Sequence, residues 1–376
     1  MVICMNAEEA LQLKIRLLTQ GARFSDKQLN LRKGGAGPIG GKYFVLPNGL
    51  PCGVPIRQGE MAKRYKSAPI EQTDDPSIWI YDNEVELKSI PRAKFLDQKT
   101  ADGTPFQKIA LLHSVGTLAT TVYQACRYWD AGTQCKYCTI PTSYMSGDTV
   151  LKKSPEHFAE VLLAAEREGV VKNVLLTTGT PDTPDMGLEL LISIIEAIRE
   201  VSRVPVGVQF EPPVEKEWIR DVANAGANAI GMHIESADES IREEICPGKF
   251  EYGPLDLYRR SWLYALDYLG RGNVSTFLLY GLGEDPEKTL MLVRELADEG
   301  VLPVVTPVRP GYGSQLAEFI PTYVNDLDAS VEFYKSIGTI LYENDLNPEN
   351  TAAGCHKCGG CTPGQEAYDW AVENHE

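Results

Sequence analysis

The stretch ATTVYQACRYWDAGTQCKYC, residues 119–138, decides the fold. It opens as an apolar, β-rich run over 119–124 and passes directly into a loop that holds Cys126, Cys135 and Cys138. A continuous apolar run of this kind predicts a strand buried on both faces, as in a parallel sheet. Since sites of such sheets lie where the strands end, the three cysteines predict a functional site at this edge.

The same unit of an apolar strand followed by an amphipathic helix repeats after residue 138. Ser154-Pro155-Glu156 marks the first helix, with a capping hydroxyl followed by a proline and an acid. Six strands with right-handed crossovers predict an α/β fold, either a partial (β/α)6 TIM-like barrel or an open doubly wound sheet. The later strands are expected at 173–178, 206–210, 229–234, 274–280 and 304–308, and the later helices at 186–200, 214–225, 238–246, 254–269 and 286–299.

Three regions are therefore expected along the chain. The barrel takes residues 119–312, and residues 1–118 form a small α+β domain with a helix near 7–20. Residues 313–376 form a tail with one helix near 327–344. Short strands are expected in the first region at 43–46 and 78–81.

Composition narrows the class of protein. The chain has 376 residues, 43% of them hydrophobic, which is enough for a large core and excludes disorder as the main state. The 52 acidic residues outnumber the 36 Lys and Arg, which argues against nucleic acid or an anionic membrane as the main partner. We expect no transmembrane helix and no signal peptide, and hence a cytoplasmic protein.

The nine cysteines are distributed in an informative way. An odd number in a chain of this length does not indicate a secreted disulfide framework. A second group of three, Cys355, Cys358 and Cys361, lies in CHKCGGC near the end, whereas Cys4, Cys52 and Cys246 stand alone. Structural zinc takes four protein ligands, whereas a [4Fe–4S] cube held by three thiolates leaves one iron open. Two clusters are therefore favoured over one zinc site drawn from these thiols or over inert surface cysteines.

These motifs resemble the radical S-adenosylmethionine (radical SAM) superfamily over roughly residues 119–310. Tyr137 before Cys138 matches the aromatic residue of the superfamily's cysteine loop. TTGTP (177–181) stands where the superfamily has its glycine-rich contact to SAM. HIES (233–236) resembles the acid that holds the SAM ribose, and LLYGLGED (278–285) resembles the glycine motif of strand five.

The spacing of the first cysteine group departs from the superfamily pattern. Eight residues, RYWDAGTQ, separate Cys126 from Cys135, where three are usual. Cys135 and Cys138 keep the usual spacing, and Cys126 needs only a longer loop to reach a third iron. The alternative is that Cys126 is not a ligand.

The resemblance implies that Cys126, Cys135 and Cys138 hold a [4Fe–4S] cluster that binds and reductively cleaves SAM. The product is a 5′-deoxyadenosyl radical, which abstracts hydrogen from the substrate. Several of the proposed contact residues also have a structural alternative: a helix cap for Glu235, ordinary turns for the glycines, a solvated acid for Glu211 and a salt bridge for Arg309. The residues expected to contact SAM or substrate are Tyr137, Thr178, Gly179, Thr180, Glu211, Glu235, Ser236, Gly281, Gly283 and Arg309.

RKGGAGP (32–38), the long cysteine loop and the terminal CHKCGGC also resemble a radical SAM subfamily encoded beside nitrilase-type enzymes. The two-group layout is similar to that of biotin and lipoyl synthases, which implies an auxiliary [4Fe–4S] cluster on Cys355, Cys358 and Cys361. The alternative for this group is zinc with His356 as fourth ligand, or a folding clip.

The layout favours sulfur insertion at an unactivated C–H bond of a small molecule or of a substrate bound to a carrier protein. The competing hypotheses are a radical rearrangement, oxidation or C–C bond reaction on a small metabolite or peptide, and a non-catalytic iron–sulfur or zinc protein. An electron donor of the ferredoxin or flavodoxin type is implied, with Lys152 and Lys153 as its candidate docking patch.

Overall fold

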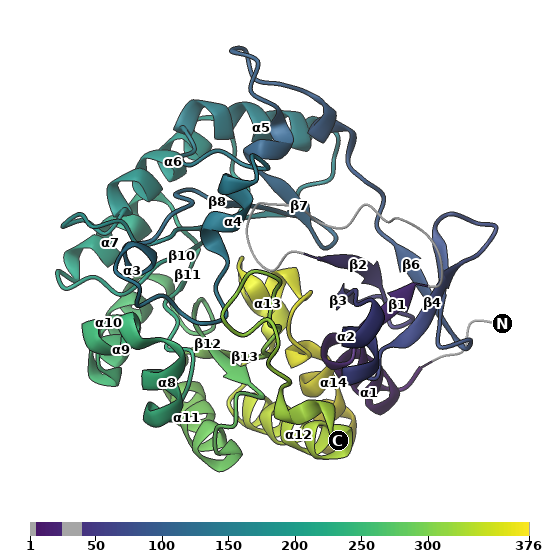
Figure 1. Cartoon of the computed structure of the whole chain (residues 1–376). Coiled ribbons are helices and arrows are strands. Elements are labelled where there is room, and N and C mark those ends of the chain that lie inside the picture. Colours follow the sequence, from purple (N-terminus) through teal and green to yellow (C-terminus); the bar gives the residue numbers. More distant parts are fainter. Residues whose placement is uncertain (1–4, 25–39, 376) are drawn as a thin grey trace.

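The computed structural model describes residues 5–24 and 40–375, and its largest feature is a curled seven-stranded sheet (Figure 1). Six strands run parallel, and β7 pairs antiparallel with β8 at one edge, while β13 forms the other edge. This confirms the α/β class and the partial six-unit barrel. In the order of the sheet, the strands are β13 (Leu302–Pro307), β12 (Val274–Tyr280), β11 (Ala229–Gly231), β10 (Val206–Gln209), β9 (Asn173–Thr177), β8 (Thr117–Thr121) and β7 (Leu111–His113).

The crossover helices form for the local reasons visible in the sequence. In α5 (Pro155–Arg167) the Ser154 hydroxyl accepts a hydrogen bond from the His157 amide at 3.1 Å, and Pro155 occupies the first turn. Pro247 begins a short additional helix between the two helices expected at 238–246 and 254–269. The remaining barrel helices are α6 (Leu188–Val201), α7 (Glu217–Ala225), α8 (Glu239–Ile245), α9 (Pro247–Tyr252), α10 (Leu255–Leu269) and α11 (Pro286–Glu299).

The barrel begins earlier in the chain than expected. The first parallel strand is Thr117–Thr121 rather than 119–124, and the hairpin partner β7 extends the sheet back to Leu111. The strand ends after Thr121: the Val122 amide still bonds to the Thr177 carbonyl of β9, but the Gln124 amide bonds to the Leu151 carbonyl outside the sheet as the chain turns into the cysteine loop.

The N-terminal region has its own sheet and core. Helix α1 (Ala7–Thr19), with a capping box between Asn6 and Glu9, packs on this sheet through Leu17 and Leu18. Phe44, Trp79 and Leu87 fill the core. RKGGAGP and Cys4 lie outside the described residues. The strands of this sheet, in order, are β1 (Ala22–Phe24), β4 (Ala68–Gln72), β5 (Ile78–Tyr81), β6 (Val85–Ser89), β2 (Gly41–Val45) and β3 (Pro51–Pro55), and a short helix α2 (Gly59–Arg64) follows β3.

The C-terminal tail returns into the concave side of the barrel sheet. After α12 (Leu327–Glu343), the short helix α13 (Cys355–Cys358) lies near the middle of Figure 1, and α14 (Gly364–His375) packs against α12. A side chain on Gly207 of β10 would lie 2.9 Å from the Gly354 nitrogen, so glycine lets the tail approach. The Thr362 hydroxyl donates to the Val305 carbonyl of β13 at 2.6 Å. Contacts to both β10 and β13 place this tail inside the curve of the sheet.

One buried ion pair joins the two ends of the chain. Lys14 of α1 donates to Glu366 of α14 and to the Gly359 carbonyl, each at 2.9 Å, and also to the Pro51 carbonyl. Both charged side chains are 1% exposed. This pair fastens α1 of the N-terminal region to α14 of the tail. No helix in residues 5–24 and 40–375 is long and apolar enough to cross a membrane.

Candidate active site

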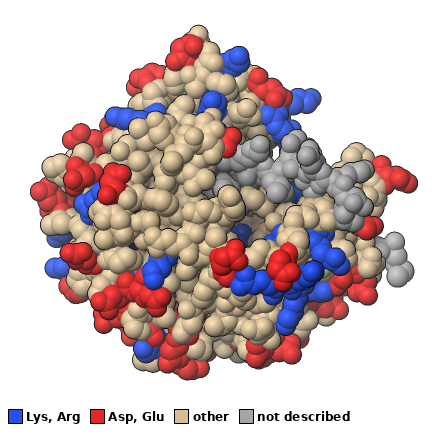
Figure 2. Space-filling view, in the orientation of Figure 1, with Lys and Arg blue, Asp and Glu red and all other residues tan. Residues whose placement is uncertain are grey.

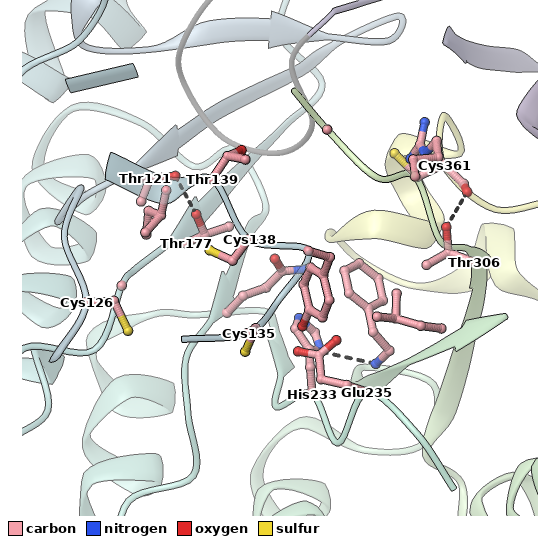
Figure 3. Close-up of a pocket in the computed structure, with 18 of the residues that line it drawn as sticks. Thr121, Cys126, Cys135, Cys138, Thr139, Thr177, His233, Glu235, Thr306 and Cys361 are labelled. Atoms are coloured by element: carbon pink, nitrogen blue, oxygen red, sulfur yellow. Dashed lines mark hydrogen bonds between the residues drawn. The ribbon is translucent and has the colours of Figure 1, made fainter. Parts of the chain in front are cut away.

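A single cavity of about 390 Å³ is lined by both groups of three cysteines (Figure 3). The first group follows β8, where the strands end, and the second lies on the tail inside the sheet. The structure thus brings together two groups of three thiols that lie more than 200 positions apart in the sequence. They are Cys126, Cys135, Cys138, Cys355, Cys358 and Cys361.

The long first cysteine loop is a compact structure. Cys126 precedes a short helix, α3 (Arg127–Asp130), which takes up half of the eight intervening residues. The Arg127 amide donates to the Thr180 carbonyl at 2.8 Å, and the Cys138 amide donates to the Cys135 carbonyl at 3.0 Å. The extra residues therefore form an anchored turn that keeps Cys126 on the same cavity as the other two thiols.

Glu211 holds this loop from outside the cavity. Its carboxylate accepts hydrogen bonds from the Tyr128 hydroxyl at 2.7 Å and from the Thr180 hydroxyl at 2.9 Å. Its residue is 6% exposed and does not line the cavity. The solvated-acid alternative is therefore wrong, and the contacts of Glu211 are with the loop that carries the cysteines.

The turn after β9 lines the cavity beside this loop. Thr178, Gly179 and Thr180 all contribute to the wall. A side chain at Gly179 would lie 1.8 Å from the Ala125 carbonyl oxygen, so only glycine permits the two loops to touch. The Thr178 hydroxyl is turned to its neighbour, the Gly179 carbonyl, at 2.7 Å.

Glu235 lines the cavity and is already paired. Lys249 of α9 places its ammonium 2.5 Å from the Glu235 carboxylate, and the Glu235 residue is 5% exposed. Glu235 also has a φ of 74°, an uncommon conformation for a residue with a side chain. Ser236 does not line the cavity. Its hydroxyl accepts a hydrogen bond from the Asp238 amide at 3.1 Å.

Gly281 and Gly283 form a turn beside the site rather than part of the cavity wall. Both have positive φ, and the Glu284 carboxylate accepts hydrogen bonds from the Gly281 and Leu282 amides, each at 2.7 Å. A side chain on Gly281 would collide with the ring of Tyr323. The turn geometry expected as the alternative is what the structure shows for this segment.

The second cysteine group is surrounded by hydrogen-bond donors. The Gln209 amide donates to the Cys355 sulfur at 3.0 Å. The Arg309 guanidinium hydrogen-bonds the Cys361 sulfur and donates to the Gly53 carbonyl at 3.0 Å. Arg309 thus lines the cavity at the second group, and it forms no ion pair with an acidic side chain of the described residues. His356 does not line the cavity with the three cysteines, and its Nε2 lies 2.9 Å from the Pro303 carbonyl.

Three further residues of the cavity region escaped prediction. Lys249 and Gln209 line the cavity, and Cys246 lies buried beside Tyr137, with its sulfur 3.9 Å from the hydroxyl. His233 also lines the cavity: its ring stacks on that of Phe277, with 4.2 Å between the ring centroids, and its Nε2 has no hydrogen-bond partner. Alternation along a strand puts His233 on the same face as Glu235, which is the signal that could have identified it.

Burial opposes ionisation of most of these thiols. It raises the pKa of Cys138 to about 11 and that of Cys355 well above its ordinary value. The pKa of Cys135 is lowered instead, chiefly by a hydrogen bond with Cys246. Since iron binds thiolates, loading either group releases protons and offsets this cost of burial.

The donor set fits clusters better than single ions. In residues 5–24 and 40–375, no three His, Cys, Asp or Glu side chains are placed to hold one metal ion together. A single zinc needs all its sulfurs at about 2.3 Å from one point. In a [4Fe–4S] cluster each thiolate binds a different iron, and three thiolates leave one iron for another ligand. Each group could therefore hold such a cluster facing the cavity.

Comparison with known proteins agrees with this arrangement. The sequence pattern of the Radical SAM superfamily matches residues 131–296, which include Cys135 and Cys138. No curated protein sequence matches the chain significantly.

Several solved structures are similar to the chain at low identity. Methylornithine synthase (PylB) is 15% identical, with a TM-score of 0.46, over 66% of this chain and 72% of that one. HydG, a maturase of the [FeFe]-hydrogenase, is 16% identical, with a TM-score of 0.45, over 67% and 56%. A radical SAM methyltransferase from Sphaerobacter thermophilus is 14% identical, with a TM-score of 0.44, over 70% and 72%. The superfamily match implies a [4Fe–4S] cluster and SAM, and the chain carries a domain of the Radical SAM superfamily.

Proposed function

We propose that the protein is a radical SAM enzyme with two [4Fe–4S] clusters that inserts sulfur at an unactivated C–H bond of its substrate. The observation that carries this proposal is the single cavity lined by both cysteine groups. A substrate inside it would lie between the two clusters. When bound, the first cluster and SAM supply a 5′-deoxyadenosyl radical that removes hydrogen, and the second supplies sulfide.

The chain's own residues place and shield this reaction. Cys126, Cys135 and Cys138 would hold the first cluster, with Thr178, Gly179 and Glu235 at the cavity wall beside it. Cys355, Cys358 and Cys361 would hold the second, with Gln209 and Arg309 donating to its sulfurs. The tail and the N-terminal region cover the second group, which would limit its contact with water.

Cavity size bears on the substrate class. A volume of about 390 Å³ falls in the lower part of the range usual for small-molecule sites. Because SAM and the substrate would share this space, we propose a small molecule or one extended acyl arm of a carrier-bound substrate, such as an octanoyl group.

The first test is anaerobic reconstitution followed by iron and sulfide counting. Near eight irons per chain are expected, and near four would remove the second cluster from the proposal. Single-turnover reactions with octanoyl-peptide substrates should then consume sulfide of the second cluster in step with product. Turnover in which SAM is cleaved and the substrate changes while all sulfide is retained would overturn sulfur insertion in favour of another radical reaction.

The electron donor is proposed to be an acidic protein of the ferredoxin or flavodoxin type. Of the docking patch predicted at Lys152 and Lys153, Lys153 is fully buried and cannot contribute, whereas Lys152 is exposed. Basic side chains gather instead around α2, where Lys63, Arg64 and Lys66 lie at the surface (Figure 2). We propose this surface, named the α2 patch, as the docking site, since attraction of opposite charges speeds encounter.

A further inference from the structure

Lys249 lies beside Glu235, the acid that the resemblance assigns to the SAM ribose. Its Nζ lies 2.5 Å from the Glu235 carboxylate and 3.5 Å from the His233 carbonyl. Both charged side chains line the cavity, with 7% of the Glu235 side chain and 19% of the Lys249 side chain exposed. Any ligand that hydrogen-bonds Glu235 inside this cavity therefore also comes within reach of the ammonium.

The chain holds Lys249 there through a dedicated segment. Residues 245–249 pack directly against the first cysteine loop: the Lys136 amide donates to the Ile245 carbonyl at 2.8 Å, and the Gly248 amide donates to the Thr133 carbonyl at 3.0 Å. A side chain on Gly248 would lie 2.3 Å from the Tyr128 ring. This close packing holds the backbone next to Lys249 against the first cysteine loop.

The charge balance explains what the pair can do. Burying a carboxylate such as that of Glu235 away from water is costly unless the carboxylate is paired. The adjacent ammonium compensates that charge, so the carboxylate keeps its capacity to accept hydrogen bonds. One ammonium has three N–H donors, and the ion pair with Glu235 uses only part of that capacity.

We propose that Lys249 and Glu235 together clamp the ribose diol of SAM. The carboxylate accepts hydrogen bonds from the hydroxyls, while the ammonium donates to a hydroxyl oxygen of the same diol. Lys249 is thus a second cofactor-binding residue of the site. This inference rests on the proposed function, because it presupposes that SAM binds at the first cluster.

Equilibrium dialysis of reconstituted protein with radiolabelled SAM tests the clamp. Lys249→Met should weaken SAM binding at least about tenfold, the usual size of a lost hydrogen bond to a charged group. The shift that SAM causes in the electron paramagnetic resonance spectrum of the reduced cluster should be lost at the same SAM concentration. Lys288→Met is the matched control, since it removes another lysine paired with an acid, Asp238, outside the cavity.

A double-mutant cycle separates contact from mere charge compensation. If Lys249 only compensates the charge of Glu235, Lys249→Met should have no further effect on SAM affinity in a Glu235→Gln background, and the clamp would be overturned. If it contacts SAM, affinity should fall again. Should the Met variant fail to retain iron, Lys249→Gln provides the same comparison with a polar side chain.

A second probe distinguishes the ribose from the amino-acid end of SAM. 5′-Methylthioadenosine has the same ribose but no carboxylate, so its competition with SAM should weaken by a similar factor in Lys249→Met. An unchanged affinity for this probe would overturn the ribose assignment. Failure of the wild type to bind SAM at all would instead overturn the proposed function.

Discussion

At the residue scale, Gly179 shows how little room the site leaves. Its missing side chain lets the turn after β9 contact the Ala125 carbonyl of the cysteine loop. Gly179→Ala should therefore push the two loops apart, with a cost of about 1–3 kcal/mol in the free energy of unfolding. Urea unfolding measures this cost, and iron counting shows whether the displaced cysteine loop still holds iron. Gly311→Ala is the control, because its added carbon would meet its nearest neighbour at an ordinary 3.8 Å.

Gln209 offers a spectroscopic prediction at the same scale. Its amide donates to the Cys355 sulfur, and a hydrogen bond to a cluster sulfur favours the reduced, more negative state. Gln209→Leu should therefore lower the reduction potential of the second cluster and leave that of the first unchanged. A redox titration followed by electron paramagnetic resonance measures the two separately, and equal shifts in both clusters would contradict the assignment.

Lys153 should leave a signature in the pH dependence of stability. Burial lowers its pKa to about 7, whereas its pKa in the unfolded chain is near 10.4. Between these values the unfolded chain binds more protons, so the free energy of unfolding should rise with pH from about 7 to 10. The difference between the wild type and Lys153→Met, measured by urea unfolding across this range, should change by a few kcal/mol. A flat difference would show that Lys153 is charged in the folded protein.

At the element scale, the second cysteine group depends on helices that are remote in sequence. Lys14 of α1 bonds the Gly359 carbonyl between Cys358 and Cys361, and Glu366 of α14 neutralises it. Lys14→Met should cost about 3–5 kcal/mol, because it leaves Glu366 buried without its partner. It should also lower the iron content of the second group and spare the first. Unfolding and iron counts of Lys14→Met and of the exposed control Lys63→Met make the comparison.

The elements themselves were largely predictable, but the contacts between distant ones were not. Apolar runs and proline caps located β12 at Val274–Tyr280 and α11 at Pro286–Glu299 to the residue. Those signals are local, and so are the two cysteine motifs. The burial of Lys153, the Lys249 contact with Glu235 and the position of Arg309 at Cys361 all depend on tertiary packing, which composition and periodicity do not encode.

At the scale of the whole molecule, the distribution of charge over the surface bears on where an acidic electron donor can dock. The chain carries a formal net charge of −16, so an acidic donor is repelled by most of it. Lys63→Glu with Lys66→Glu should slow reduction by flavodoxin about tenfold at low salt, with little effect on reduction by dithionite. Arg220→Glu with Arg260→Glu, on α7 and α10, is the charge-matched control. Equal slowing by both pairs would exclude the α2 patch as the docking site.

The Lys14–Glu366 pair also has a consequence for biosynthesis. The first cysteine group and the strands that carry it are complete once about 310 residues have left the ribosome, whereas Lys14 must wait for residue 366 to meet its partner. Until then the Lys14 contacts with Gly359 and Glu366 cannot form, and the concave side of the barrel sheet stays accessible. If the second group holds a cluster, as proposed, we expect cluster insertion to precede the packing of α14 against α12 and α1.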